Sequence, residues 1–271
     1  FVMYVNCKYM RTTEFWRSNL SDSIISNENT FGSLLNVFKT ATGATISDGL
    51  DEMFFANSWT GENAIVMKGS FDRNRMTTYL NNDSVFVKTE KPDGLTYYKH
   101  KSSNTMFFLK DNFTICASNY EEQLLRMKNA NDTSNTGLLV NKDFIKAIES
   151  IVYKESLWLV STERTFIRGV FANFIDLKSG KNFNKEVKDS LNENSSDSLT
   201  KNDDVISNKI HEKVNSISLN ERMKNDFDLL LQFECVDRNA TSYINKLFNG
   251  IIGIAKISSA SRKDRKDTAF E

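Results

Sequence analysis

Two distant stretches of the chain repeat one order of apolar and polar positions. Ala64–Leu80 has the pattern of a strand, then Asp-Arg-Asn, then a helix, and Leu229–Leu247 has the same pattern. In each copy a short apolar run bounded by polar turn residues predicts a buried strand. Side-chain oxygens at the turn can accept hydrogen bonds from the first free N–H groups of the helix. The candidates for these N-caps are Asp72 and Asp237, or Asn74 and Asn239. We therefore predict a duplicated unit.

Other periodic segments extend each half. Val2–Lys8 alternates as a strand does, and Leu157–Ser161 followed by an amphipathic helix restates this strand-then-helix opening. Between them, Asn29–Thr42 has apolar residues at helical spacing, and Gly43 marks its end. Each half then continues into a β-hairpin. The predicted hairpin strands are Glu52–Asn57 with Ala64–Phe71, and a strand near Val214–Asn220 with Phe227–Val236.

The first half contains an additional run of short strands. The turn residues between the apolar segments predict a four-stranded antiparallel meander. Its strands are Val85–Thr89, Leu95–His100, Met106–Lys110 and Phe113–Ala117. Two helices, Asn119–Lys128 and Asn141–Ser150, are predicted to follow, each opened by an asparagine cap.

These elements predict an α+β fold with antiparallel sheets, in which a strand-helix-hairpin-helix unit is duplicated and the meander belongs only to the first half. We place the first half at residues 1–151 and the second at 156–257. The second half contains a polar loop at 178–204, rich in Asn, Ser, Lys and Asp, and a charged tail follows at 258–271.

The charge balance and the lengths of the apolar runs argue against nucleic-acid binding and against a membrane-spanning segment. Lys+Arg 35 balance Asp+Glu 35, so the formal net charge is +0 and no global charge favours nucleic acid. The aromatic and lysine residues of the meander are therefore interpreted as one packed and one solvated sheet face. No apolar run approaches the length of a membrane span, which is about 18 residues or more. Any membrane attachment would come through a lipid anchor upstream of this fragment.

No motif predicts catalysis, a metal site or a cofactor. Cys7, Cys116 and Cys235 are far apart in predicted strands, which favours buried free thiols. His100 and His211 lack the neighbours of a nucleophilic site and are interpreted as surface residues. The adjacent acids are interpreted as solvated surface groups, with a favourable helix dipole at the second pair. These acid pairs are Asp51-Glu52, Glu121-Glu122 and Asp203-Asp204.

Trp59, in the predicted loop of the first hairpin, is the candidate partner-binding residue, because an exposed tryptophan can anchor a protein partner. The alternative is that its ring folds back onto the sheet.

The order of these signals resembles large exported bacterial lipoproteins with duplicated α+β domains. The resemblance rests on several stretches, namely VMYVNCKYMRTTEF, TGATISDGLDEMFFAN, GSFDRNRMTTYL, TYYKHKSSNTMFFLKDNFTICASNYEEQLLRM and GLLVNKDFIKAI. It implies an exported, periplasmic or cell-surface location and carries no catalytic residues over to this chain.

We expect a non-catalytic exported or envelope-associated domain that binds a protein partner or forms part of an assembly. Two alternatives stay open: a hydrolase that uses Asp and Glu carboxylates, and a carrier of an apolar ligand held between sheet and helices.

Overall fold

The computed structural model describes residues 1–19, 38–58, 61–131, 140–176 and 212–250. Its strands are β1 (Val2–Asn6), β2 (Leu50–Asn57), β3 (Asn63–Gly69), β4 (Phe86–Glu90), β5 (Thr96–His100), β6 (Met106–Leu109), β7 (Thr114–Ser118), β8 (Leu157–Ser161), β9 (Val214–Met223) and β10 (Phe227–Cys235). Its labelled helices are α1 (Cys7–Met10), α2 (Glu14–Asn19), α5 (Arg73–Asn82), α6 (Glu121–Asn129), α7 (Lys142–Glu149) and α8 (Arg164–Asp176). Helical residues also occupy 38–42 and 238–250.

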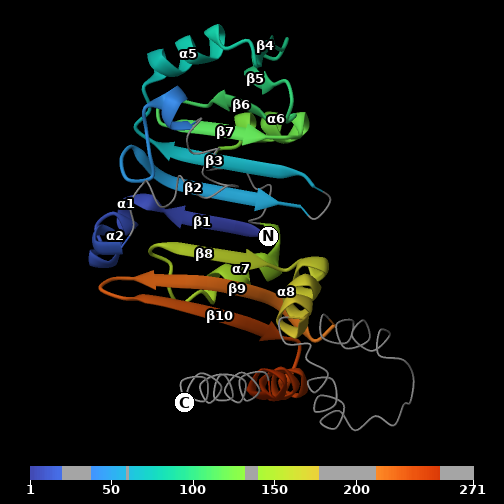
Figure 1. The fold of residues 1–271 in the computed structure, drawn as a ribbon. Helices are drawn as coiled ribbons and strands as arrows, with labels where there is room; N and C mark the ends of the chain where they lie inside the picture. The colour runs from blue at the N-terminus through green and yellow to red at the C-terminus, as the bar shows by residue number, and fades with distance from the viewer. Residues whose placement is uncertain (20–37, 59–60, 132–139, 177–211, 251–271) are drawn as a thin grey trace, which may run out of the picture. The chain divides into compact units, whose positions relative to one another are not determined.

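The ten strands form one antiparallel sheet in the order β10-β9-β8-β1-β2-β3-β7-β6-β5-β4 (Figure 1). β1 and β8 are neighbours within this sheet. From β1 the order continues to β2 and β3, and from β8 it continues in the other direction to β9 and β10. The predicted α+β class with antiparallel pairing is confirmed.

Alternation along the strands sorts the side chains onto two faces. On one face, a core cluster contains Val5 of β1, Leu50, and Ile115 of β7. Helix α5 adds Met76 and Leu80 to this cluster, and Trp16 of α2 also belongs to it. This face therefore buries the helices that follow β1 and β3.

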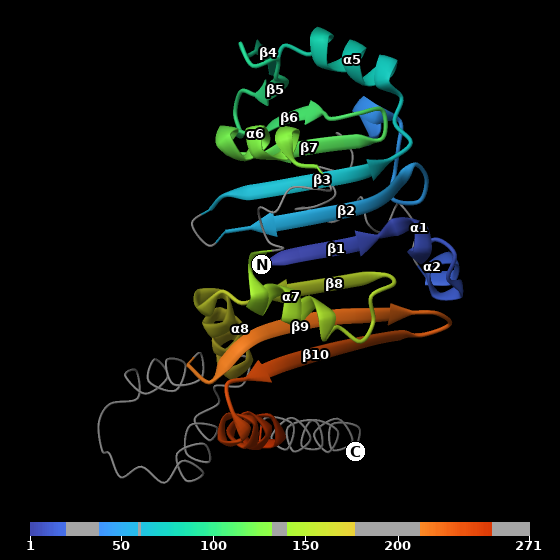
Figure 2. The ribbon, with the colours of Figure 1, turned by 180° about the vertical axis from the view of Figure 1, so that it is seen from behind.

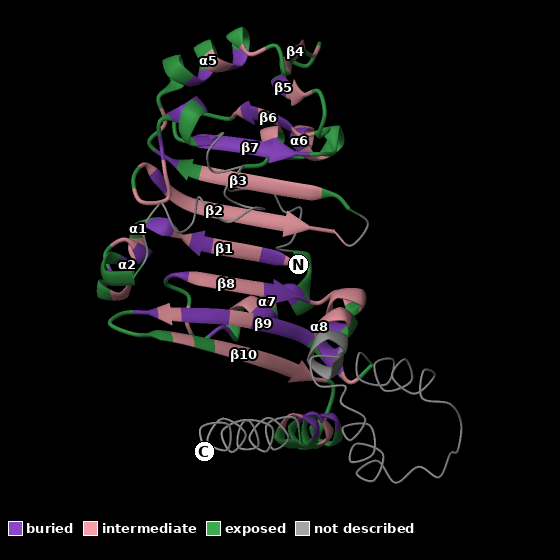
Figure 3. Ribbon diagram, in the orientation of Figure 1, coloured by how far each residue is buried: buried purple, intermediate pink, exposed green. Residues whose placement is uncertain are grey.

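Helices α6 and α7 lie on the other face, toward the viewer in Figure 2. Leu124 and Met127 of α6 pack with Phe108 and Cys116 in one cluster. Phe144 and Ala147 of α7 pack in a second cluster, whose strand members are Val2 and Val160. Strand β7 is buried along its length, whereas β2 and β3 are mostly half-buried (Figure 3). The two helices thus leave part of β2 and β3 less covered.

The chain divides into two compact units, one of Phe1–Ser161 with Ser218–Gln232 and one of Thr162–Ile217 with Phe233–Glu271. In the second unit, Phe171 of α8 lies 5.1 Å from Phe233, measured between ring centroids. Phe248, within the helical residues 238–250, lies 5.0 Å from Phe233.

Several predicted local features are confirmed. Asp72 accepts a hydrogen bond from Arg75 N at 2.9 Å, and Asp237 accepts one from Ala240 N at 2.7 Å, so the aspartate of each repeat caps its helix. Asn141 caps α7 through Phe144 N at 3.0 Å. The helix predicted from Asn29 is described only from residue 38, and the polar loop and charged tail lie outside the described residues.

Two predicted positions are wrong. Cys7 is not in a strand, because the Asn6 side chain accepts a hydrogen bond from Tyr9 N at 2.9 Å and caps helix α1 at that point. Asn119 does not cap α6, whose N-cap residue is Tyr120. The Asn119 side chain instead accepts from Asn63 N at 2.8 Å and donates to Gly61 O at 2.7 Å, so it ties the β2–β3 hairpin to β7.

Candidate functional site

A row of directly opposed apolar side chains crosses the centre of the sheet on the face of α6 and α7. Tyr4 of β1 is opposite Trp158 of β8 on one side and Phe54 of β2 on the other. The row continues from Phe54 to Val66 of β3 and then to Cys116 of β7. Opposed aromatic and β-branched residues stabilise a sheet through their side-chain contacts. The alternation of each strand therefore places one apolar row across five strands.

Three of these residues, Trp158, Tyr4 and Phe54, form what we call the aromatic row. The ring centroids of Tyr4 and Phe54 are 4.7 Å apart, and those of Tyr4 and Trp158 are 5.5 Å apart. Trp158 packs against the α7 cluster and Val66 against the α6 cluster. Tyr4 and Phe54 pack in neither cluster, and both are half-buried. The middle of the row is thus the part of this face that the helices leave accessible.

The next row toward the strand ends is polar. Asn6, Glu52 and Lys68 are opposed across β1, β2 and β3. They open into a pocket of about 450 Å³ that we call the strand-end pocket. Its lining residues are Asn6, Lys8, Asp51, Glu52, Lys68, Gly69, Ser70 and Phe113.

Contacts join the pocket to the aromatic row. The Tyr4 hydroxyl donates to Glu52 Oε1 at 2.8 Å. Lys68 Nζ lies 3.8 Å from Glu52 Oε2 and 5.9 Å from the centroid of the Phe54 ring. Burial, and next the hydrogen bond to Glu52, raise the pKa of the Tyr4 hydroxyl well above its ordinary value. Tyr4 therefore stays a neutral hydrogen-bond donor at physiological pH.

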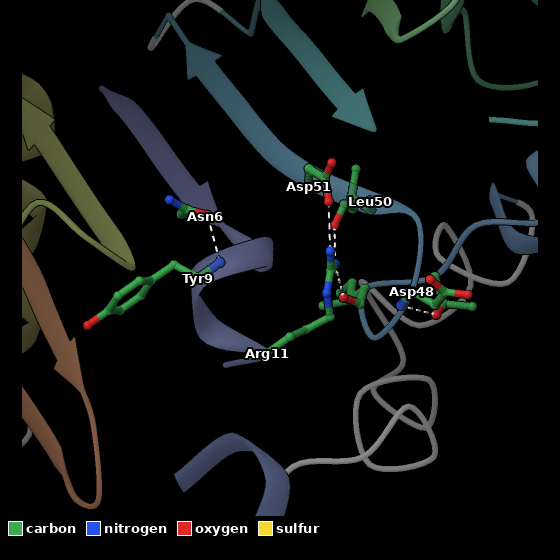
Figure 4. A network of polar contacts seen from close by, with 8 residues as sticks. Asn6, Tyr9, Arg11, Asp48, Leu50 and Asp51 are labelled. Carbon is green, nitrogen blue, oxygen red and sulfur yellow. Dashed lines mark hydrogen bonds and ion pairs between the residues drawn. The ribbon is translucent and has the colours of Figure 1, made fainter. Parts of the chain in front are cut away.

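An arginine anchors the helix that carries Lys8 (Figure 4). Arg11, at the end of α1, donates to Asp51 Oδ1 at 2.7 Å and to the carbonyl oxygen of Ile46 at 2.9 Å. It also donates to the carbonyl oxygen of Leu50. These bonds hold α1 against the start of β2, so they position Lys8 and Asp51 at the pocket.

Replacing Arg11 by methionine is expected to lower the free energy of unfolding by about 2–3 kcal/mol, because three charge-assisted hydrogen bonds are lost and Asp51 loses its cation. Urea unfolding monitored by circular dichroism measures the change. Arg126→Met is the control, since Arg126 pairs with Glu122 where their side chains are 67% and 55% exposed. The control is expected to change stability by no more than about 0.5 kcal/mol. Equal losses in both variants would contradict the anchoring role.

Of the two predicted acid pairs that the structure describes, Asp51-Glu52 lies in a pocket with other charged groups. Asp51 and Glu52 line the strand-end pocket. Glu121 and Glu122 lie in the first turn of α6 and have different partners, Lys91 at 2.5 Å and Arg126 at 2.9 Å. His100 accepts a hydrogen bond from Ser103 N in the loop after β5. Trp59, His211 and Asp203-Asp204 lie outside the described residues, so their roles stay predictions.

The cysteines are all free, with Cys7 and Cys116 buried and Cys235 half-buried. Burial raises the pKa of the Cys7 thiol and of the Cys116 thiol to about 11. Both thiols are therefore protonated and unreactive at neutral pH. Within the described ranges, no group of three or more His, Cys, Asp or Glu side chains is arranged to hold a metal ion. None of the described helices is long and apolar enough to span a membrane.

Sequence reasoning missed Tyr4, Phe54 and Lys68. The alternation of β1 and β2 was available as a signal, because Tyr4 shares a face with Asn6, and Phe54 shares a face with Glu52. What the sequence lacks is the pairing of β1 with β8, which brings Trp158 to Tyr4 from more than half the chain away.

No protein-family model matches the chain, and the comparison with curated proteins finds no match. Among solved structures, crystal form III of TP0453 from Treponema pallidum is similar, with 12% sequence identity and a TM-score of 0.44 over 91% of this chain and 81% of that one. Crystal form I of TP0453 is similar with 13% identity and a TM-score of 0.37, over 91% of this chain and 92% of that one.

Proposed function

We propose that this protein is a non-catalytic domain that binds a protein partner on the sheet face between α6 and α7. The observation that carries the proposal is the half-buried aromatic row, which ends beside a polar pocket. Tyrosine, tryptophan and phenylalanine are enriched where protein surfaces bind one another, because they supply a large apolar area with little loss of side-chain entropy.

The half-burial of Tyr4 and Phe54 supports binding over a purely structural role. A core row would be covered along its whole length, as Cys116 and Phe108 are by α6. Tyr4 is held by its hydrogen bond to Glu52, and its ring packs on that of Phe54, yet both residues are only half-buried. Rigid and partly exposed aromatic groups are suited to anchor a partner.

One observation favours the hydrolase alternative, since Asp51 and Glu52 share a pocket. Both carboxylates already have partners, however. Asp51 accepts from Arg11, and Glu52 accepts from Tyr4 and faces Lys68. A catalytic acid or base must present a free carboxyl oxygen to its substrate, whereas one oxygen of each of these carboxylates already accepts a hydrogen bond from Arg11 or Tyr4. The arrangement supports binding better than acid-base catalysis.

A photocrosslinking residue tests the proposal. Phe113 is 65% exposed and lines the pocket, so p-benzoylphenylalanine in its place samples whatever occupies this face. We expect crosslinking to one recurring protein in the native cells, reduced about tenfold or more when Phe54→Leu is added. Phe54→Leu keeps an apolar side chain, and its melting temperature shows whether the fold is retained.

The control is the same crosslinker at Val87, which is 43% exposed on β4. Crosslinks shared by both positions, or unaffected by Phe54→Leu, would overturn the proposal. So would turnover on a panel of ester, peptide and glycoside substrates that Glu52→Gln abolishes.

The proposed location is outside the cytoplasm, in keeping with the sequence resemblance to exported lipoproteins. Intact-mass analysis and fractionation of the full-length protein from its native host test this location. Acyl mass on a chain in the membrane fraction is expected. An unmodified chain that retains an initiator methionine would contradict it.

A further inference from the structure

We propose that the partner presents an acidic peptide segment, with a carboxylate side chain in the strand-end pocket between Lys8 and Lys68 and an apolar side chain over the aromatic row. This inference rests on the proposed function and names the chemistry of what is bound.

The charged groups around the strand-end pocket differ in how fully they are paired. Lys8 is exposed, and none of the described residues forms an ion pair with it. The Lys68 side chain is 50% exposed, and its nearest carboxylate oxygen, Glu52 Oε2, is at 3.8 Å. Asp51 is neutralised by Arg11 at 2.7 Å. The two ammonium groups are thus less fully paired than the two carboxylates, which favours an anionic ligand.

Apolar rings lie close to the lysines of this pocket. Phe113, 65% exposed, stands at the pocket, and the ring of Phe54 lies under the Lys68 ammonium group. A small inorganic anion would leave both rings in water. A peptide that carries an acidic and an apolar side chain uses the lysines and the rings together. The combination therefore fits an acidic peptide with aromatic or aliphatic residues better than it fits a free anion.

The pocket is open at the ends of antiparallel strands, where the polar groups of Ser70 and Asn6 line it as well. The Asn6 side-chain oxygen already caps α1, but its amide group adds a donor beside the lysines. Charged and polar donors around an apolar floor give orientation as well as affinity.

The test uses the full chain and a phage-displayed library of random linear peptides. We expect the enriched peptides to contain Asp or Glu together with Phe, Tyr or Leu. Selection against the Lys8→Gln, Lys68→Gln double variant is expected to lose the acidic enrichment. A matched control, Lys88→Gln with Lys101→Gln, removes two lysines on and beside the β4–β5 hairpin and is expected to select the same acidic peptides as the wild type.

Affinity of a selected peptide is then measured by the fluorescence of Trp158 in a chain with Trp16→Phe and Trp59→Phe, which leaves Trp158 as the single tryptophan. The dissociation constant is expected to rise about tenfold in the Lys8, Lys68 variant, and to rise with added salt. Circular dichroism verifies that each variant is folded. If the single-tryptophan chain does not fold, the same titration is made with a chain that retains Trp16 and Trp59.

The outcomes separate the two proposals. Enriched peptides without acidic residues, bound equally by the lysine variants but weakened by Phe54→Leu, overturn the acidic-peptide inference and leave the proposed function standing. If the selected peptides bind the lysine variant and Phe54→Leu as tightly as the wild type, both the acidic-peptide inference and the proposed function are wrong. Vesicles of phosphatidylglycerol are tested in the same way. If they change the fluorescence of Trp158 in the wild type but not in the Lys8, Lys68 variant, and no peptide changes it, the ligand is an anionic lipid surface and the peptide inference is wrong.

Discussion

Replacing Gly69 by alanine is expected to lower the free energy of unfolding by at least about 3 kcal/mol. A Cβ atom on Gly69 would lie 2.0 Å from the carbonyl oxygen of Gly49. That oxygen cannot withdraw freely, because it accepts a hydrogen bond from Ser70 N at 2.7 Å. Gly49 itself has φ +90, and a Cβ there would lie 2.7 Å from Ala44 Cβ. Urea unfolding followed by circular dichroism measures the loss.

The control for this prediction is Gly61→Ala in the β2–β3 loop. Gly61 has φ +95, but a Cβ at this position meets nothing within 4 Å. Its replacement is expected to cost only about 1 kcal/mol, the strain of an alanine with positive φ. If both variants lost the same stability, the close approach of the two backbones would not be the reason that position 69 requires glycine.

This close approach also shapes the candidate site. Gly69 lines the strand-end pocket, and the β2 ladder is irregular between Leu50 and Glu52, opposite Gly69. A bulge of this kind reorients the side chains that follow it. Asp51 points to Arg11 and Glu52 to Tyr4, so consecutive acids have different partners. The Gly69→Ala protein that still folds is therefore expected to bind the selected peptides less tightly than the wild type does.

Local signals predicted most of the elements correctly. Strand β8 has the predicted bounds, Leu157–Ser161, because a short apolar run between polar residues leaves little choice. Asp72 and Asn141 cap their helices as predicted, since a cap depends only on the next three residues. The exception at Cys7 is also local, because Asn6 was an available cap inside an apparently alternating strand.

The site was not predictable in the same way. It depends on which strands become neighbours, and the pairing of β1 with β8 is decided by the packing of the whole sheet. The sequence places Tyr4 and Phe54 on strands, but only the register puts their rings 4.7 Å apart. Likewise, no spacing in the sequence indicates that Lys8 and Lys68 line one pocket. The partner-binding role of Trp59, the residue chosen from the sequence, stays a prediction, because Trp59 lies outside the described residues.

A second large effect is expected at Glu221 of β9, where the stability of the protein should depend on pH. The residue is 2% exposed, and neither carboxylate oxygen has a hydrogen-bond partner among the residues that the structure describes. The neighbouring Arg222 pairs with Asp228 instead, and its guanidinium carbon lies 5.1 Å from the ring centroid of Tyr153. Burial raises the pKa of Glu221 from its ordinary 4.5 to about 7.

The sign of the effect follows from this shift. Below about pH 4.5 the carboxyl group is protonated in both the folded and the unfolded chain, and it contributes no pH dependence. As the pH rises from 4.5 toward 7, the unfolded chain releases the proton while the folded chain retains it, so stability falls. Above about pH 7 the loss is complete, and the difference between the two pKa values corresponds to about 3 kcal/mol.

Glu221→Gln is therefore expected to be more stable than the wild type at about pH 8, with a gain that approaches about 3 kcal/mol relative to its effect at about pH 4.5. Glu221→Met removes the polar group altogether and should show the same pH-dependent gain. The control is the exposed Glu155→Gln, for which a change of no more than about 0.5 kcal/mol is expected at either pH. Urea unfolding of the variants across this pH range provides the measurement. A gain that is equal at both ends of the range would show that Glu221 is ionised with a satisfied partner, and that its burial does not oppose folding in neutral solution.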